Sequence, residues 1–219
     1  MKVGIDGVLL GIWTDVKNAS RILDIGTGTG LIALILAQRN KNSTIEAVDI
    51  EADAVSQAVE NVKNSPWAER IKVQQVSLQE FAGRKNDRFD LIVSNPPYFV
   101  NSTKTPLQNR TTARHTDSLT HEELIENAIR LLAPNGRICI ILPIIEGLQC
   151  VAFAKSKGLC CSNMVKVFPK PMVEAKRLLL EFTLQSLEQK ETELIIESDI
   201  RHQYSTEFTT LAKDFYLKL

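Results

Sequence analysis

The sequence predicts an α/β fold, a doubly wound and mostly parallel sheet of seven strands with an antiparallel hairpin at its edge. Short apolar runs alternate with helical patterns, as in parallel sheets that helices cover on both faces. A glycine-rich turn at 24–30 joins the first apolar run to a helical pattern. A stiff Asn-Pro-Pro-Tyr turn at 95–98 ends the fourth run, because neither proline can donate a hydrogen bond to a sheet.

Five apolar runs predict the buried parallel strands: 21–25, 44–49, 71–76, 89–94 and 136–142. The helical patterns predict helices over 30–39, 52–64, 121–132 and 147–157. The third of these helices opens with a capping box, Thr120 with Glu123, and is expected to stop near Pro134.

Two β-rich runs come next, at 160–168 and 177–185, and Pro169-Lys170-Pro171 follows the first of them. Their spacing predicts an antiparallel pair at the sheet edge. No linker, internal repeat or low-complexity stretch interrupts the pattern, so we expect one domain over residues 1–219.

Composition narrows the class of protein. With 26 basic and 26 acidic residues the net charge is zero, so no global field attracts nucleic acid and DNA is not an expected partner. No apolar run reaches the ~18 residues of a membrane span, and no leader pattern precedes the fold. The four cysteines form no C-x-x-C pair, which predicts reduced thiols without a metal. We expect a cytoplasmic monomer.

The glycine turn predicts a nucleotide site. Its glycines let the backbone approach a ligand closely, at the point where the first helical N–H groups face it. Asp49 closes the second apolar run, where an acid typically binds a ribose diol. The spacing is G-x-G-x-G, which differs from the G-x-G-x-x-G of dinucleotide sites and from the P-loop.

The Asn-Pro-Pro-Tyr turn predicts a site for a planar NH2 group. A stiff turn can hold the side-chain carbonyl of Asn95 beside the backbone carbonyl of Pro96, and Tyr98 can stack on the ligand. Pro97 keeps the turn extended. The alternative is a turn that only ends the strand and leaves a tyrosine on the surface.

Together the two turns resemble those of class I S-adenosylmethionine (SAM) methyltransferases, whose first motif is an acid followed by G-x-G-x-G. The second turn is similar to the motif of the amino-methyltransferases. The resemblance implies SAM as cofactor and the following cofactor-binding residues: Asp24, Gly26, Thr27, Gly28, Gly30, Asp49, Ile50, Ser77, Leu78 and Asn95.

Further segments are similar to one bacterial family, the tRNA1(Val) adenine-N6-methyltransferases: 1–11, 64–68, 94–99, 110–115 and 213–217. The family modifies adenine 37, just 3′ of the anticodon. The resemblance implies methyl transfer from SAM to the exocyclic N6 of that adenine in tRNA, with residues 95–98 holding the base.

The chain departs from the family pattern at three points. Ser77 stands where such enzymes usually carry an Asp for the adenine of SAM, and Ile5 replaces a small polar residue. The family's fold normally extends upstream of the glycine-acid motif at Asp6 and Gly7, so the N-terminus is expected to be truncated or its start misassigned.

Two basic segments are candidates for gripping the anticodon arm. The polar stretch 100–119 follows the second turn and carries Lys104, Arg110, Arg114 and His115. The alternative is a solvated loop without a role. A second patch consists of Lys166, Lys170, Lys176 and Arg177. Its lysines could equally serve only to block aggregation at an edge strand.

Three other functions remain open. A glutamine N5-methyltransferase acting on release factors also uses Asn-Pro-Pro-Tyr, but usually has an N-terminal helical domain. A guanine-N2 rRNA methyltransferase usually has Phe at the fourth motif position and a duplicated domain. A non-enzymatic partner subunit with this fold would be expected to lose Asp49 or the Asn95 turn.

Overall fold

The computed structural model describes residues 4–84, 87–97, 119–200 and 203–216. Its strands, in chain order, are β1 (Arg21–Ile25), β2 (Thr44–Asp49), β3 (Ile71–Gln75), β4 (Phe89–Ser94), β5 (Leu132–Pro143), β6 (Cys160–Phe168), β7 (Arg177–Thr183) and β8 (Lys190–Ile195). Its α-helices are α1 (Ile5–Trp13), α2 (Leu31–Arg39), α3 (Ala52–Lys63), α4 (Leu78–Arg84), α5 (His121–Leu131), α6 (Ile144–Ser156) and α7 (Thr206–Ala212).

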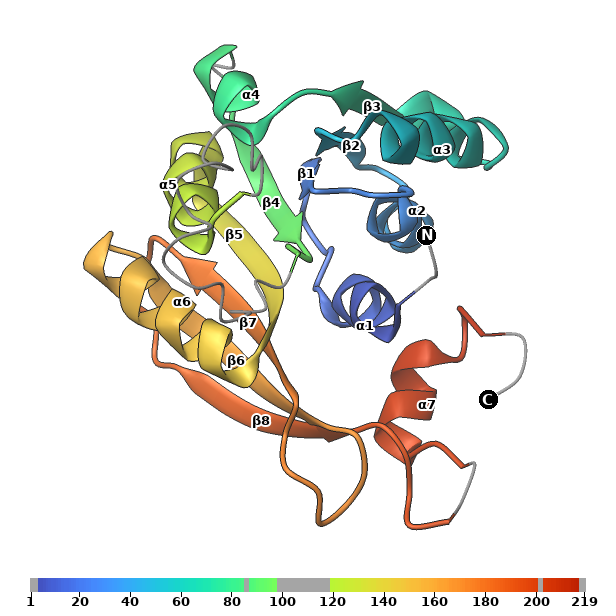
Figure 1. Ribbon diagram of the computed structural model, residues 1–219, viewed down its shortest axis with the longest axis vertical. Helices are drawn as coiled ribbons and strands as arrows, with labels where there is room; N and C mark the ends of the chain where they lie inside the picture. The colour runs from blue at the N-terminus through green and yellow to red at the C-terminus, as the bar shows by residue number, and fades with distance from the viewer. Residues whose placement is uncertain (1–3, 85–86, 98–118, 201–202, 217–219) are drawn as a thin grey trace, which may run out of the picture.

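All eight strands form one sheet, in the order β3-β2-β1-β4-β5-β7-β6-β8 (Figure 1). The first five in sequence are mutually parallel, and β7 runs antiparallel between β5 and β6. Strand order reverses between β1 and β4, which is where ligands bind in open sheets of this type. The glycine turn follows β1 and the Asn95 turn follows β4, so both lie at this switch point.

Helices cover both faces of the sheet (Figure 1). On one face α1, α2, α3 and α7 enclose one apolar cluster, and on the other α4, α5 and α6 enclose a second. β1 and β4 are buried on both sides, which explains their unbroken apolar sequences. The prediction of a doubly wound α/β sheet is therefore confirmed. Within the described residues no helix is long and apolar enough to cross a membrane.

The predicted number of strands was wrong. An eighth strand, β8, pairs in parallel with β6, with Val165 opposite Thr192. The β6–β7 pair is antiparallel as predicted but lies inside the sheet, with β8 outside it. Only Leu194 of β8 is buried, Ile195 is half-buried, and the four positions before them carry Lys, Glu and Thr. Charged edge strands of this kind lack the apolar run by which the inner strands are recognised.

The helix predictions held in place and type, with shifts at the ends. The capping box of α5 is present, since the Thr120 side chain accepts from the Glu123 backbone and Glu123 accepts from that of Thr120. The helix ends at Leu131 and β5 begins at once, earlier than the predicted stop at Pro134. The four cysteines are free, and burial raises the pKa of Cys150 to about 12.

Three helices were not predicted: α1, α4 and α7. In α1 all residues from Gly7 to Ile12 are buried, so no polar face alternates with an apolar one to give a helical period. The other two have seven residues each, which is too short for a clear period.

Candidate functional site

The glycine turn after β1 has a backbone conformation that favours glycine at three positions. Gly26, Gly28 and Gly30 have φ of 67°, 57° and 83°, in the left-handed region that other residues rarely adopt. A side chain at Gly30 would approach the Cβ of Ala58 in α3 to 3.4 Å, whereas one at Gly26 would meet no atom within 4 Å. The turn is therefore tight on the side of α3 and open at Gly26, as a turn that receives a ligand must be.

Asp24 is a fully buried carboxylate beneath this turn. Its Oδ2 accepts from the Thr27 hydroxyl at 2.6 Å and from the Ala33 backbone N–H at 3.1 Å. Its Oδ1 has no hydrogen-bond partner among the described residues. Burial raises the pKa of Asp24 to about 7, and the negative charge of Asp49 contributes in the same direction. A buried acid of this kind favours a cationic or hydrogen-bond-donating ligand nearby.

Asp49 ends β2 and ties the glycine turn to the next helix. Its Oδ2 accepts from the Gly28 backbone N–H at 2.7 Å, and its Oδ1 accepts from the Glu51 N–H at 3.0 Å. Each carboxylate oxygen has a second lone pair, so the group can still accept from a ribose diol. Ile50 beside it is 38% exposed, which suits a side chain that covers a flat ring.

The Ser77 side chain has a structural role at the start of α4. Its hydroxyl accepts from the Glu80 N–H at 3.2 Å and so caps the first turn of α4. The Val76 N–H donates to the Asp49 carbonyl at 2.9 Å, which brings this segment beside the end of β2. The Leu78 side chain is buried in the core, so Leu78 can offer a ligand only its backbone.

The Asn95 turn is joined to the glycine turn by one side chain. The Ser94 hydroxyl, buried at the end of β4, donates to the Ile25 carbonyl at 2.9 Å, immediately before Gly26. The two residues are also register partners in the parallel pair of β1 and β4. Asn95 is half-buried, Pro96 buried and Pro97 exposed. No sequence pattern singles out the Ser94 hydroxyl, because its partner is set by the pairing of β1 with β4.

Helix α1 adds a wall that sequence reasoning did not place in the site. A Cβ on Gly7 would lie 3.3 Å from Leu31 Cδ2 and 3.8 Å from Asn95 Nδ2, so Gly7 lies where α2 meets the Asn95 turn. One turn later, a Cβ on Gly11 would come within 2.9 Å of Ile35. Two glycines four residues apart in an apolar segment are a signal of close helix contact that the sequence does contain.

The candidate RNA-binding residues fall into two groups. Lys104, Arg110, Arg114 and His115 lie outside the described residues, as does Tyr98 of the second turn, which was expected to stack on the base. In the second patch, Lys166 pairs with Glu191 of β8, Lys170 with Glu197 at 3.0 Å, and Arg177 with Asp6 at 2.9 Å. Lys176 donates its backbone N–H to Val167. The strand that was not predicted thus supplies an acidic partner for one of the lysines.

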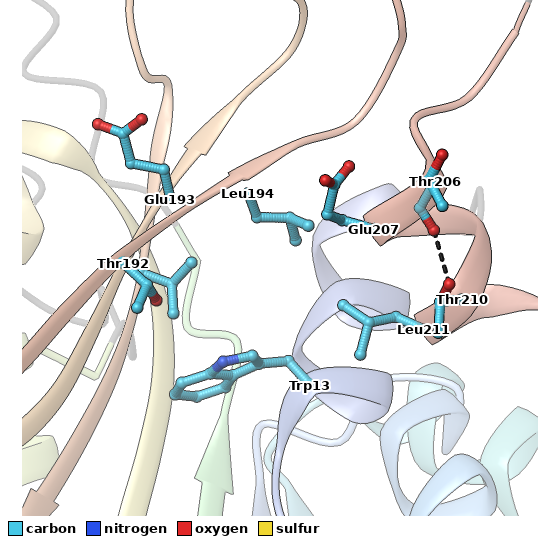
Figure 2. A pocket seen from close by; sticks show the side chains of 9 residues that line it. Trp13, Thr192, Glu193, Leu194, Thr206, Glu207, Thr210 and Leu211 are labelled. Atoms are coloured by element: carbon cyan, nitrogen blue, oxygen red, sulfur yellow. Dashed lines mark hydrogen bonds between the residues drawn. The ribbon is translucent and has the colours of Figure 1, made fainter.

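A separate cavity of about 420 Å³ lies between α1, β8 and α7. Figure 2 shows the Trp13 indole and Leu194 facing it, with Glu207 at its rim. None of the residues that line it belongs to the two turns, and it has no part in the site described above.

Comparison with known proteins shows the family to which this chain belongs. A model of the methyltransferase small-domain family matches residues 8–149, which include the glycine turn, the Asn95 turn and α1 from Val8 onward. The chain belongs to this family. A relative from Parabacteroides distasonis, named tRNA1(Val) (adenine(37)-N6)-methyltransferase, is 48% identical over 100% of this chain and 92% of its own length. One of the same name from Bacteroides fragilis is 46% identical with the same coverage.

Solved structures agree on the fold. A predicted O-methyltransferase from Agrobacterium tumefaciens superposes with a TM-score of 0.75 over 95% of both chains, at 19% identity. At that identity the likeness concerns the fold alone. The small-domain methyltransferase family and its SAM-dependent chemistry rest on the family match and on the relatives that cover the whole chain.

Proposed function

We propose that this chain transfers a methyl group from SAM to the exocyclic N6 of an adenine in tRNA, adenine 37 of tRNA1(Val). The observation that carries the proposal is the bond from Ser94 to Ile25, which fixes the Asn95 turn against the glycine turn. A cofactor turn and an amine-accepting turn then share one crevice at the switch point of the sheet. The names of the relatives at 46–48% identity support the same substrate.

The residues around the glycine turn fit SAM. Asp49 has lone pairs for the ribose hydroxyls, and the open side of Gly26 leaves room for a ligand against the backbone. The unpartnered Oδ1 of Asp24 suits the positive charge or the donors of the methionine part. When bound, SAM supplies an electrophilic methyl group on a sulfonium. Ile50, Ser77 and Leu78 would flank its adenine, with Ser77 contributing a hydroxyl in place of the usual carboxylate.

The Asn95 turn would act on the amine of the target base. That nitrogen is a poor nucleophile because its lone pair is delocalised into the ring. When Asn95 Oδ1 and Pro96 O accept its two protons, they favour the pyramidal nitrogen of the transition state, so the interaction strengthens during reaction. Unstacking the base costs a few kcal/mol. Stacking on Tyr98, worth ~1–3 kcal/mol, offsets much of that cost.

The tRNA would be held locally, at the anticodon arm, by a single-domain monomer in the cytoplasm. A chain of zero net charge has no general attraction for RNA. Lys166 and Lys170 already pair with acidic side chains. The basic residues of 100–119, Arg110 and Arg114 above all, are therefore the first candidates for phosphate contacts.

The proposal is tested by incubating the protein with bulk tRNA and labelled SAM and mapping the modified nucleoside. We expect N6-methyladenosine at position 37 of tRNA1(Val), formed about 100-fold more slowly by Asn95→Ala, the matched control. Label on a release-factor glutamine, or on guanine of rRNA, with tRNA unlabelled would refute the proposal. Absence of any transfer while SAM still binds would favour a partner subunit.

A further inference from the structure

Arg177 is the first residue of β7 and pairs with Pro143, the last residue of β5. It therefore lies at the carboxyl end of the parallel strands, the same end of the sheet as the site. Its Nε donates a 2.9 Å hydrogen bond to Asp6 Oδ2, and the two side chains are only 30% and 14% exposed. Its Nη1 donates to the carbonyl of Lys176. This guanidinium is therefore engaged within the protein, in contrast to the phosphate-binding role that the sequence suggested.

The carboxylate that Arg177 holds belongs to the first turn of α1. The N-cap of α1 is Gly4, so no side chain caps the first turn of the helix. Gly7 follows directly and lies against Leu31 and Asn95. Gly7 lets the backbone of α1 approach α2 closely. Because glycine has no side-chain atoms, this contact by itself holds the first turn of α1 only weakly. The bond between Asp6 and Arg177 is a polar link, among the described residues, between the start of α1 and the sheet beside the Asn95 turn.

We propose that Arg177 is a positioning residue for methyl transfer, which acts through Asp6 by holding the first turn of α1 against Asn95. The proposal rests on the function proposed above and adds a residue, from the far end of the chain, to the support of the amine-binding turn. It also removes Arg177 from the residues that contact RNA.

The expected consequence is a change in turnover with little change in cofactor binding. Without the ion pair the first turn of α1 loosens, and the backbone of Gly7 no longer packs closely beside the Asn95 amide. A displacement of about 1 Å at a reacting group can cost on the order of 100-fold in rate. The glycine turn is held independently, by Asp49 and by the packing of Gly30 on α3, so SAM affinity is preserved.

The test compares Arg177→Met, Asp6→Asn and the double variant. We expect kcat for tRNA methylation to fall about 10- to 100-fold in each single variant. The double variant should be no worse than either, because both changes remove the same link. Affinity for S-adenosylhomocysteine by calorimetry should stay within about 2-fold of wild type, and Arg177→Lys should recover part of kcat because it keeps the charge.

Arg137→Met is the matched control for general loss of an ion pair. Arg137 is 22% exposed and pairs with Glu181 and Asp15, beyond the other end of α1. At a temperature where all variants are folded by circular dichroism, we expect it to keep the kcat of wild type. A similar fall in this control would show that Arg177 acts only through stability, and would overturn the proposal.

Two further results would overturn it. One is unchanged kcat in Arg177→Met. The other is weaker tRNA binding in Arg177→Met but not in Asp6→Asn, with the log–log salt slope reduced by about one, because that pattern marks a phosphate contact.

Hydrogen exchange separates this proposal from the function on which it rests. The amides of Val8 to Leu10 should exchange faster in both single variants than in wild type, with no substrate present. If the wild type methylates no tRNA but exchange still rises, the proposed function fails while the link to α1 stands. If exchange is unchanged in both variants, the link itself is refuted.

Discussion

Replacing Asp24 by Asn should make the protein more stable at alkaline pH. Asp24 is fully buried, and its Oδ2 accepts from Thr27 and Ala33 while Oδ1 has no partner among the described residues. An Asn can keep both bonds through its carbonyl oxygen and place its NH2 where Oδ1 lies. The variant therefore mimics the protonated acid at every pH.

The magnitude follows from the pKa of Asp24, which burial raises from 3.8 to about 7. Because the folded pKa lies above the unfolded one, the stability from this group is complete below pH 4 and is lost as pH rises through 7. With 1.36 kcal/mol for each pH unit, the loss in wild type between pH 5 and pH 8 is about 2–3 kcal/mol. The Asn variant has no such loss.

Urea unfolding of the ligand-free wild type and of Asp24→Asn at pH 5 and pH 8 measures this effect. All other titrating groups are common to both proteins and cancel in the difference. We expect the free energy of unfolding of the variant, relative to wild type, to rise by about 2–3 kcal/mol from pH 5 to pH 8. An equal difference at both pH values would show that Asp24 is ionised throughout and would refute the reasoning.

Three further predictions concern the proposed activity. Asp49→Ala should weaken S-adenosylhomocysteine binding by about 1–3 kcal/mol in calorimetry, since a charged acceptor is lost; unchanged affinity contradicts the ribose assignment. Asn95→Ala should leave that affinity nearly intact but lower turnover by about 100-fold, and near-normal turnover excludes the amine-accepting role. Charge reversal at Arg110 and Arg114 should raise the KM for tRNA. It should also reduce the log–log slope of tRNA affinity against salt concentration by about one unit for each lost phosphate contact. If the affinity of the double variant keeps the same salt dependence, the RNA site lies elsewhere.

The sequence by itself determined the parallel core and the position of the two turns. Strands buried on both faces need continuous apolar runs, so β1 and β4 could be read from composition and length alone. Glycines with positive φ and prolines without an N–H are likewise local constraints, so the sequence alone predicts turns at 24–30 and 95–98.

Only the tertiary structure decided the contacts between distant segments. β8 is placed by its pairing with β6, because half of its own residues are charged and they form no apolar run. Ser94 reaches Ile25 across 69 positions, and Arg177 reaches Asp6 across 171. The hydrophobic period of a segment shows which of its faces is buried. An ion pair instead depends on which two segments lie side by side in the folded protein. For that reason the sequence could name Arg177 as a candidate for RNA contact but could not show that it pairs with Asp6.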